Sequence, residues 1–142
     1  MAGAALNLIV DSAAPPQVPG IIKSICILDD DVSVLSSLQE LLDSDGLEAR
    51  TFNSPDQFLA YAKGHAVTLA ILDVWMPETN GIEVQERLHE LSPATQVIMI
   101  TGREEAPIRA SALERGAVAF LVKPFDDETF LELVRKAVCE PT

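Results

Sequence analysis

Carboxylates stand at the ends of two short apolar runs in this sequence. The range Asp29–Asp31 directly follows one run, and Asp73 directly follows another. If the two runs are neighbouring strands of a parallel sheet, these like charges lie within a few ångströms and repel unless a cation is present. Mg²⁺ takes oxygen ligands and keeps some of its waters, which suits two carboxylates and a backbone carbonyl. The sequence therefore predicts a site for a divalent cation, Mg²⁺ or Mn²⁺.

Asp73 can act as a nucleophile beside such a cation. A carboxylate that attacks phosphorus forms an acyl phosphate, and a metal neutralises charge on the transferring oxygens. Two further apolar runs end in Thr101-Gly102 and Lys123-Pro124. Lysine supplies a compact charge for a phosphoryl oxygen, and threonine supplies a hydrogen bond that exists only when that oxygen is there. This set predicts a switch that accepts a phosphoryl group, with Pro124 a candidate for a cis peptide bond.

These runs belong to a regular alternation of strands and helices. Short apolar runs bounded by polar residues alternate with stretches of 3.6-residue periodicity. The predicted strands are Ser24–Leu28, Glu48–Phe52, Leu69–Leu72, Val97–Ile100 and Ala119–Val122. Most of them are continuously apolar, as expected for parallel strands that are covered on both faces. A helix follows each strand; the first is predicted to end at Gly46, and the second to begin at Ser54-Pro55.

This alternation favours an open, doubly wound α/β sheet. We predict a flavodoxin-like (βα)5 fold with five parallel strands in the order 2-1-3-4-5, read from the five apolar runs. A closed eight-unit barrel needs roughly 200 residues or more, and this chain has 142. Residues 1–20, rich in alanine and proline, are predicted to be a flexible leader, and residues 21–140 to form one domain.

The chain is strongly acidic, which restricts its partners. It has 22 Asp and Glu against 10 Lys and Arg, and a formal net charge of -12. This charge repels nucleic-acid phosphates and anionic membrane surfaces, so we expect direct binding to neither. The sequence predicts no signal peptide and no transmembrane helix. Because Cys26 and Cys139 form neither a metal-ligand cluster nor a disulfide framework, we expect a cytoplasmic protein.

Several motifs, each at the end of a predicted strand, together resemble the receiver-domain signature of two-component response regulators. They are Leu28-Asp29-Asp30-Asp31, Leu72-Asp73-Val74-Trp75-Met76-Pro77 with Gly81, Ile100-Thr101-Gly102, and Phe120-Leu121-Val122-Lys123-Pro124-Phe125. The resemblance covers roughly Ile22 to Val138. It implies a phosphorylation-dependent signalling domain rather than an enzyme, with a sensor histidine kinase or a phosphotransfer protein as its partner.

The resemblance also implies roles for individual residues. Asp73 would be the phosphoacceptor, and Asp30, Asp73 and the Trp75 backbone carbonyl would be direct Mg²⁺ ligands. Asp29 would support the ion through a water molecule. Trp75 lies two residues beyond Asp73, and Arg103 lies two residues beyond Thr101. Both are expected to flank the phosphoryl group.

Thr101 and Lys123 are implied to sense the phosphoryl group, and Phe120 to be a rotating aromatic switch. From the residues alone, an aromatic at the end of a buried strand is equally a static core residue. Asp31 is equally an N-cap of the following helix. Six of the ten basic residues follow residue 102, so the last two helices and the fifth strand are a candidate face for a homodimer or another partner.

Other functions fit these residues less well. A receiver that has lost phosphorylation and acts only as a protein-interaction module is the main alternative, but Asp73, Thr101 and Lys123 argue against it. A haloacid-dehalogenase-type phosphatase also attacks with an aspartate, and Asp29 and Asp31 have its D-x-D spacing, but no cap segment is evident. A flavin or nucleotide carrier needs a phosphate-binding loop after the first strand, where this chain has carboxylates. The segment from Glu105 to Phe120 resembles receivers that precede a helix-turn-helix domain, so a stand-alone receiver and part of a longer regulator both stay open.

Overall fold

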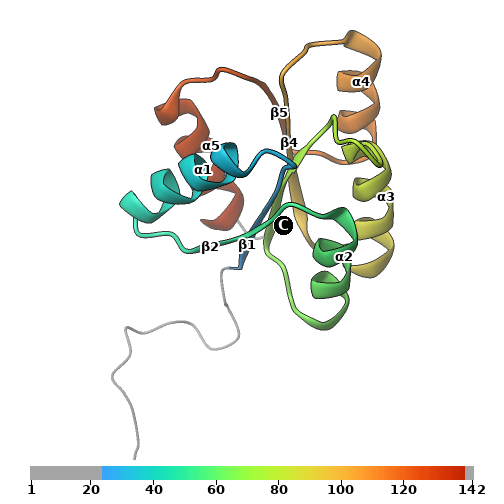
Figure 1. Ribbon diagram of the computed structural model, residues 1–142, viewed down its shortest axis with the longest axis horizontal. Helices are drawn as coiled ribbons and strands as arrows, with labels where there is room; N and C mark the ends of the chain where they lie inside the picture. Colours follow the sequence, from blue (N-terminus) through green and yellow to red (C-terminus); the bar gives the residue numbers. More distant parts are fainter. Residues whose placement is uncertain (1–23, 140–142) are drawn as a thin grey trace, which may run out of the picture.

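The computed structural model describes residues 24–139, which form one sheet between two layers of helices (Figure 1). The strands are β1 (Ile25–Leu28), β2 (Ala49–Phe52), β3 (Leu69–Asp73), β4 (Gln96–Thr101) and β5 (Ala119–Val122). The helices are α1 (Val32–Ser44), α2 (Pro55–Gly64), α3 (Gly81–Leu91), α4 (Ala106–Glu114) and α5 (Asp127–Cys139). The predicted alternation is confirmed. The predicted leader, residues 1–20, lies outside the described residues.

The strands pair in parallel in the order β2-β1-β3-β4-β5, as predicted. Strands β1 and β3 are neighbours, and Leu28 pairs with Leu72 in the shared register. Asp29 and Asp73 are therefore the next residues along two adjacent strands. The sheet register itself brings the predicted carboxylates to one edge.

Two strands are longer than predicted because each continues into a buried polar residue. Strand β3 includes Asp73, which is 4% exposed and pairs with Ile100. Strand β4 extends through Thr101, which is fully buried and pairs with Val122. An apolar run marks only the hydrophobic part of a strand, whereas the backbone ladder continues as far as its partners allow.

Each face of the sheet packs against its own helices. Helices α1 and α5 cover one face, and α2, α3 and α4 cover the other (Figure 1). Successive side chains of β1 alternate between the two layers: Ile25 and Ile27 face α1 and α5, and Cys26 and Leu28 face the other layer. Burying one such Leu or Ile side chain contributes about 1.5–3 kcal/mol. The strands are thus fixed from both sides, which holds their ends in place.

Local signals at the helix ends are as the sequence predicted. The Asp31 carboxylate accepts a hydrogen bond from the Ser33 backbone N–H at 2.9 Å and caps α1. Ser54 caps α2, whose first residue is Pro55. Gly46 follows α1 with a φ of 77°, in the left-handed region that glycine adopts without strain.

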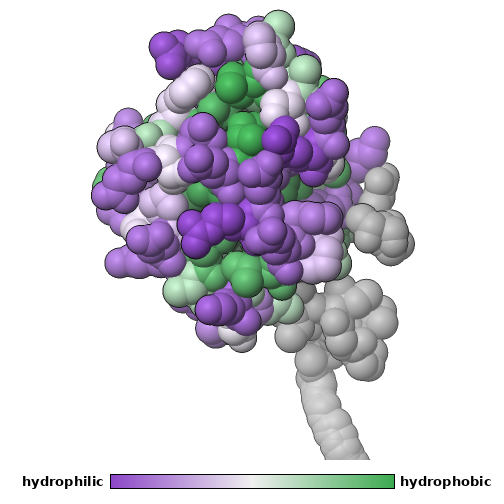
Figure 2. All heavy atoms as spheres, turned by 90° about the vertical axis from the view of Figure 1, so that its right-hand side faces the viewer, coloured by the Kyte–Doolittle hydropathy of each residue, from purple (hydrophilic) through white to green (hydrophobic). Residues whose placement is uncertain are grey.

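Helices α5 and α4 differ in how they are held to the rest of the domain. On one side, Arg135 of α5 donates to both Asp45 carboxylate oxygens at 2.8 and 2.9 Å, and so joins α5 to the end of α1. On the other side, Ala112 is the single buried residue of α4. Figure 2 shows the side that carries α2, α3 and α4, where polar side chains surround smaller apolar areas. Within residues 24–139, no helix is long and apolar enough to cross a membrane.

Candidate functional site

Three carboxylates converge where β1 and β3 end. One oxygen from each of Asp29, Asp30 and Asp73 lies within 4.8 Å of the others. Asp29 and Asp73 are buried, whereas Asp30 is exposed. Asp31 belongs to α1 as its cap, and hydrogen bonds led by that from the Ser33 hydroxyl lower the pKa of its carboxyl. The predicted gathering of carboxylates is thus present, with Asp31 outside it.

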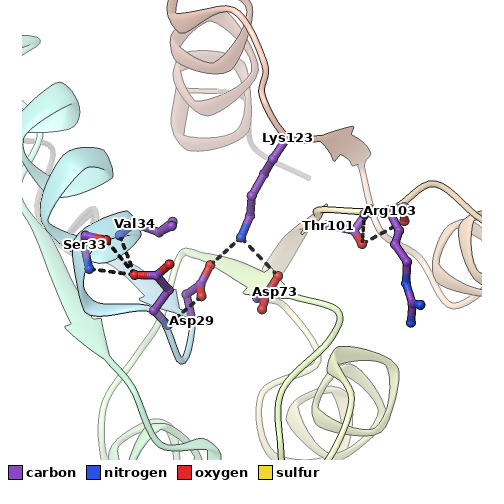
Figure 3. Close-up of polar contacts among 8 residues, drawn as sticks. Asp29, Ser33, Val34, Asp73, Thr101, Arg103 and Lys123 are labelled. Atoms are coloured by element: carbon purple, nitrogen blue, oxygen red, sulfur yellow. Dashed lines mark hydrogen bonds and ion pairs between the residues drawn. The ribbon is translucent and has the colours of Figure 1, made fainter.

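Lys123 connects the two buried carboxylates (Figure 3). Its Nζ lies 2.9 Å from Asp29 Oδ2 and 3.4 Å from Asp73 Oδ1. The residue directly follows β5, so its position is set by the strand that pairs with β4. The Lys123–Pro124 peptide bond is cis, as proposed from the sequence. One ammonium group therefore faces two carboxylates, which leaves the cluster with an excess of negative charge.

The excess negative charge changes the ionisation of Asp73. Burial raises the pKa of the Asp73 carboxyl to about 7, and the charge of Asp29 adds to this effect, while Lys123 opposes it. Burial alone would lower the pKa of the Lys123 ammonium, but its hydrogen bond to Asp29 and the charge of Asp73 raise it above its ordinary value. Lys123 therefore stays charged. Asp73 is easily protonated, because the cluster lacks a second positive charge beside its carboxylates.

These residues fit a hard divalent cation. The donors are all oxygen atoms, which Mg²⁺ and Mn²⁺ prefer. They open on a hollow of about 430 Å³ lined by Asp29, Asp30, Asp73, Trp75 and Lys123, among others. A cation in such a place relieves the repulsion that raises the pKa of Asp73. The acidic pocket is therefore suited to a metal on charge, donor type and space.

Thr101 reaches the same edge of the sheet, but its hydroxyl is bonded elsewhere. It donates to the Arg103 carbonyl at 2.9 Å and lies 3.2 Å from the Arg103 backbone N–H, from which it accepts (Figure 3). The side chain is fully buried at the end of β4. A contact between this hydroxyl and a group bound at Asp73 requires these two bonds to be exchanged.

Trp75 and Arg103 both line the hollow, and they also contact each other. The Arg103 guanidinium lies 4.6 Å from the centroid of the Trp75 ring, a cation–π distance. Arg103 also pairs with Glu105 at 3.5 Å. This stacking could not be predicted from the sequence, because the spacing of the two residues along the chain gives no sign of it. Both residues of the stacked pair are thus part of the wall of the hollow.

Gly81 has a positioning role that the sequence analysis did not assign, although the residue is part of the motif. A Cβ atom here would overlap the Asp73 carbonyl oxygen and lie 2.8 Å from Met99 Cε. The Gly81 N–H donates to the Val74 carbonyl at 2.7 Å. Only glycine allows α3 to begin this close to the end of β3. Gly81 therefore fixes the backbone that carries Asp73.

Phe120 lies inside the layer formed by β5 and α4. Its side chain is 7% exposed and packs in the same core as Met99 and Ala112. The Arg109 guanidinium lies 5.5 Å from the centroid of its ring. This is the packed arrangement of the aromatic residue, and its rotation stays a prediction.

The fold agrees with comparisons to known proteins. The family model for the response regulator receiver domain matches residues 25–135. The response regulator protein TodT of Pseudomonas putida is 41% identical over 114 residues, which are 80% of this chain and 50% of that protein. A CheY-like receiver domain protein from Methanospirillum hungatei is 30% identical with a TM-score of 0.78, covering 82% of this chain and 94% of that one. The beryllofluoride-activated NtrC4 receiver domain dimer is 32% identical with a TM-score of 0.78, covering 82% and 97%.

This chain belongs to the response regulator receiver domain family. It is therefore a phosphorylation-dependent signalling domain of two-component systems, and the resemblance found in its motifs is confirmed. The flavodoxin-like fold is confirmed by the strand order and by these structures. The chain spans about half the length of the curated relatives it matches.

Proposed function

We propose that Asp73 is the residue of this chain that accepts the phosphoryl group, from a sensor histidine kinase or a phosphotransfer protein. A carboxylate oxygen attacks phosphorus and forms an acyl phosphate, while the bond from phosphorus to the donor's histidine nitrogen breaks. That nitrogen keeps the electron pair and takes up a proton. The observation that best supports this proposal is the position of the buried Asp73 carboxyl, which lines the hollow together with Asp30 and Lys123. Beyond its own phosphorylation and dephosphorylation, the domain turns over no substrate and acts in the cytoplasm.

We also propose that Mg²⁺ or Mn²⁺ is required. Asp30, Asp73 and the Trp75 carbonyl would be direct ligands, and Asp29 would act through a water molecule. When bound, the ion neutralises charge on the phosphoryl oxygens. An indirect role for Asp29 is supported by its present bonds, since one of its oxygens faces Lys123 and the other accepts from the Asp31 backbone N–H at 2.9 Å.

Lys123 and Thr101 then act as sensors of the phosphoryl group. The Lys123 ammonium exchanges its contact with the Asp73 carboxylate for one with a phosphoryl oxygen. The Thr101 hydroxyl gives up its bond to the Arg103 carbonyl and donates to a second phosphoryl oxygen. Because Arg103 begins the segment that leads into α4, this exchange moves that segment and gives Phe120 room to turn. A group shifts a two-state equilibrium only through contacts that differ between the states, and these two contacts differ.

The output of the switch is a change in a protein-binding face made by α4, β5 and α5. These elements carry basic side chains in an otherwise acidic chain, among them Arg109 and Lys136. Homodimerisation is supported by the receiver domain dimer of NtrC4, which is 32% identical to this chain, and we assign it to this face. Sedimentation with and without beryllofluoride tests this face, and Arg109→Glu should weaken the activated dimer and leave the monomer folded.

The phosphoacceptor is tested by incubation with Mg²⁺ and acetyl phosphate, followed by intact mass. The wild-type chain should gain one hydroxylamine-sensitive phosphoryl group, and Asp73→Asn should gain none. Asp31→Asn is the matched control, because this exposed neighbour caps α1 and should keep the adduct. A persistent stoichiometric adduct on Asp73→Asn would place the acceptor at another residue.

A further inference from the structure

The hydroxyl of Thr101 and the ring of Trp75 are connected through one residue, Arg103. The hydroxyl makes two hydrogen bonds to the Arg103 backbone: it donates to the carbonyl at 2.9 Å and accepts from the N–H at 3.2 Å (Figure 3). The side chain of Arg103 lies on the Trp75 ring, with its guanidinium carbon 4.6 Å from the ring centroid. Arg103 therefore links the segment that follows β3 to the hydroxyl at the end of β4.

The two partners of this stack are anchored differently. Trp75 is half-buried and packs against the core that α2, α3 and α4 cover, and its Nε1 atom is buried. The domain thus holds the ring in place. Gly102, Arg103 and Glu104, by contrast, are exposed. A segment with little buried surface has low local stability unless other contacts hold it. The stack on Trp75 gives this segment such a contact.

Two ion pairs also involve this segment, but they hold it less well. Arg103 lies 3.5 Å from Glu105, and both side chains are exposed, so this pair contributes little. Glu104 lies 3.5 Å from Arg109. Because Arg109 belongs to α4, this second pair lies within the part of the chain that the proposed switch moves. The stack instead ties the segment to a ring that the core holds.

We propose that Trp75 and Arg103 are a positioning pair that holds the Thr101 hydroxyl in its unphosphorylated arrangement and so sets how readily the domain switches. This role rests on the sensor role of Thr101 proposed above. The stack keeps the Arg103 backbone within reach of the hydroxyl. It thereby favours the bonds that the hydroxyl must break to reach a phosphoryl oxygen. A cation–π contact at an exposed site changes such an equilibrium about two- to fivefold.

The test follows the switch in the full chain before any phosphoryl group is bound. Amide proton–nitrogen correlation spectra are recorded for the wild type without metal and for the wild type saturated with Mg²⁺ and beryllofluoride. The signals of Ala110 and Ala112 of α4 then define a line from one arrangement to the other. Trp75→Leu and Arg103→Gln each remove the stack. In their metal-free spectra these signals should lie on the line, with the ratio of switched to unswitched chains raised about two- to fivefold.

Matched variants separate the stack from a general disturbance of the site. Trp75→Phe keeps an aromatic face and Arg103→Lys keeps a cation, so both should stay near the wild-type positions. The double variant Trp75→Leu, Arg103→Gln should move no further than either single variant, because each removes the same contact. Arg103 is exposed, so Arg103→Gln should keep the fold even if Trp75→Leu does not.

Three results would overturn the positioning role: wild-type signal positions in both single variants, signals displaced away from the line, or a double variant that moves by the sum of the two single displacements. Acetyl phosphate should still label Asp73 in each case, so the failure would belong to the positioning pair alone. If beryllofluoride moves no signal of α4 in the wild-type chain, the sensor role of Thr101 is wrong and the positioning role is wrong with it.

Discussion

The raised pKa of Asp73 predicts that removing this carboxylate stabilises the metal-free protein at alkaline pH. In the folded chain the pKa of Asp73 is about 7, against an ordinary value of 3.8. Between these two values the folded state holds a proton that the unfolded state has lost, so stability falls as the pH rises through this window. A difference of about 3 pKa units corresponds to about 4 kcal/mol. Asp73→Asn cannot ionise and escapes this loss.

We therefore expect Asp73→Asn to be about 2–4 kcal/mol more stable than wild type at about pH 8 in EDTA, and nearly equal to it at about pH 4. Urea unfolding across this pH range measures the difference directly. Adding Mg²⁺ should stabilise wild type more than the variant, because the ion binds the ionised site of the folded state. Asp43→Asn, an exposed change on α1, is the control and should follow the wild-type profile.

The neighbouring aspartates test the cause of the shift. The charge of Asp29 contributes more to the raised pKa of Asp73 than that of Asp30 does. Asp29→Asn should therefore lower the pKa of Asp73 more than Asp30→Asn, as measured by carboxyl carbon shifts. If Asp73→Asn is less stable than wild type at about pH 8 without metal, the burial argument is wrong.

Three further predictions concern metal, coupling and lifetime. Asp30→Ala should weaken Mg²⁺ binding strongly, followed by fluorescence of Trp75, the only tryptophan; unchanged affinity would place the ion elsewhere. Lys123→Ala should still be phosphorylated, but its phosphorylation-induced dimerisation should fall because Thr101 alone makes the new contact; wild-type coupling would contradict this role. Trp75 and Arg103 should shield the acyl phosphate from water, so the double variant Trp75→Asn, Arg103→Glu should lose its phosphoryl group faster than the parent. Equal decay rates would refute the shielding.

The sequence predicts the fold and the carboxylate cluster well, since both depend on local signals. Apolar runs give the strands, and a carboxylate directly after two neighbouring strands must lie at one edge whatever the loops do. Contacts between loops could not be predicted in this way. The stacking of Arg103 on Trp75 depends on how two loops approach each other in space, and nothing in either segment reports it.

Buried polar partners are equally hard to predict. The Gln85 bond to Ala112 joins residues 27 positions apart on two helices, and a glutamine on an amphipathic helix is ordinarily a surface residue. The bonds between Thr101 and Arg103 could not be predicted either, because the sequence places the hydroxyl at the site but does not give its rotamer. Element type and order follow from periodicity, whereas side-chain partners follow from packing.

Because α4 is weakly anchored, little free energy should be needed to shift it. A helix with Ala112 as its single buried residue would lose little apolar burial on shifting, so we expect the two arrangements of the proposed switch to be close in free energy. Two new contacts at the phosphoryl group are then enough to change which arrangement dominates. We expect the opposite layer, in which Arg135 of α5 bonds to Asp45, to change less. Amide hydrogen exchange should thus be faster in α4 than in α5, so we expect α4 to be the part of the proposed output face that changes most.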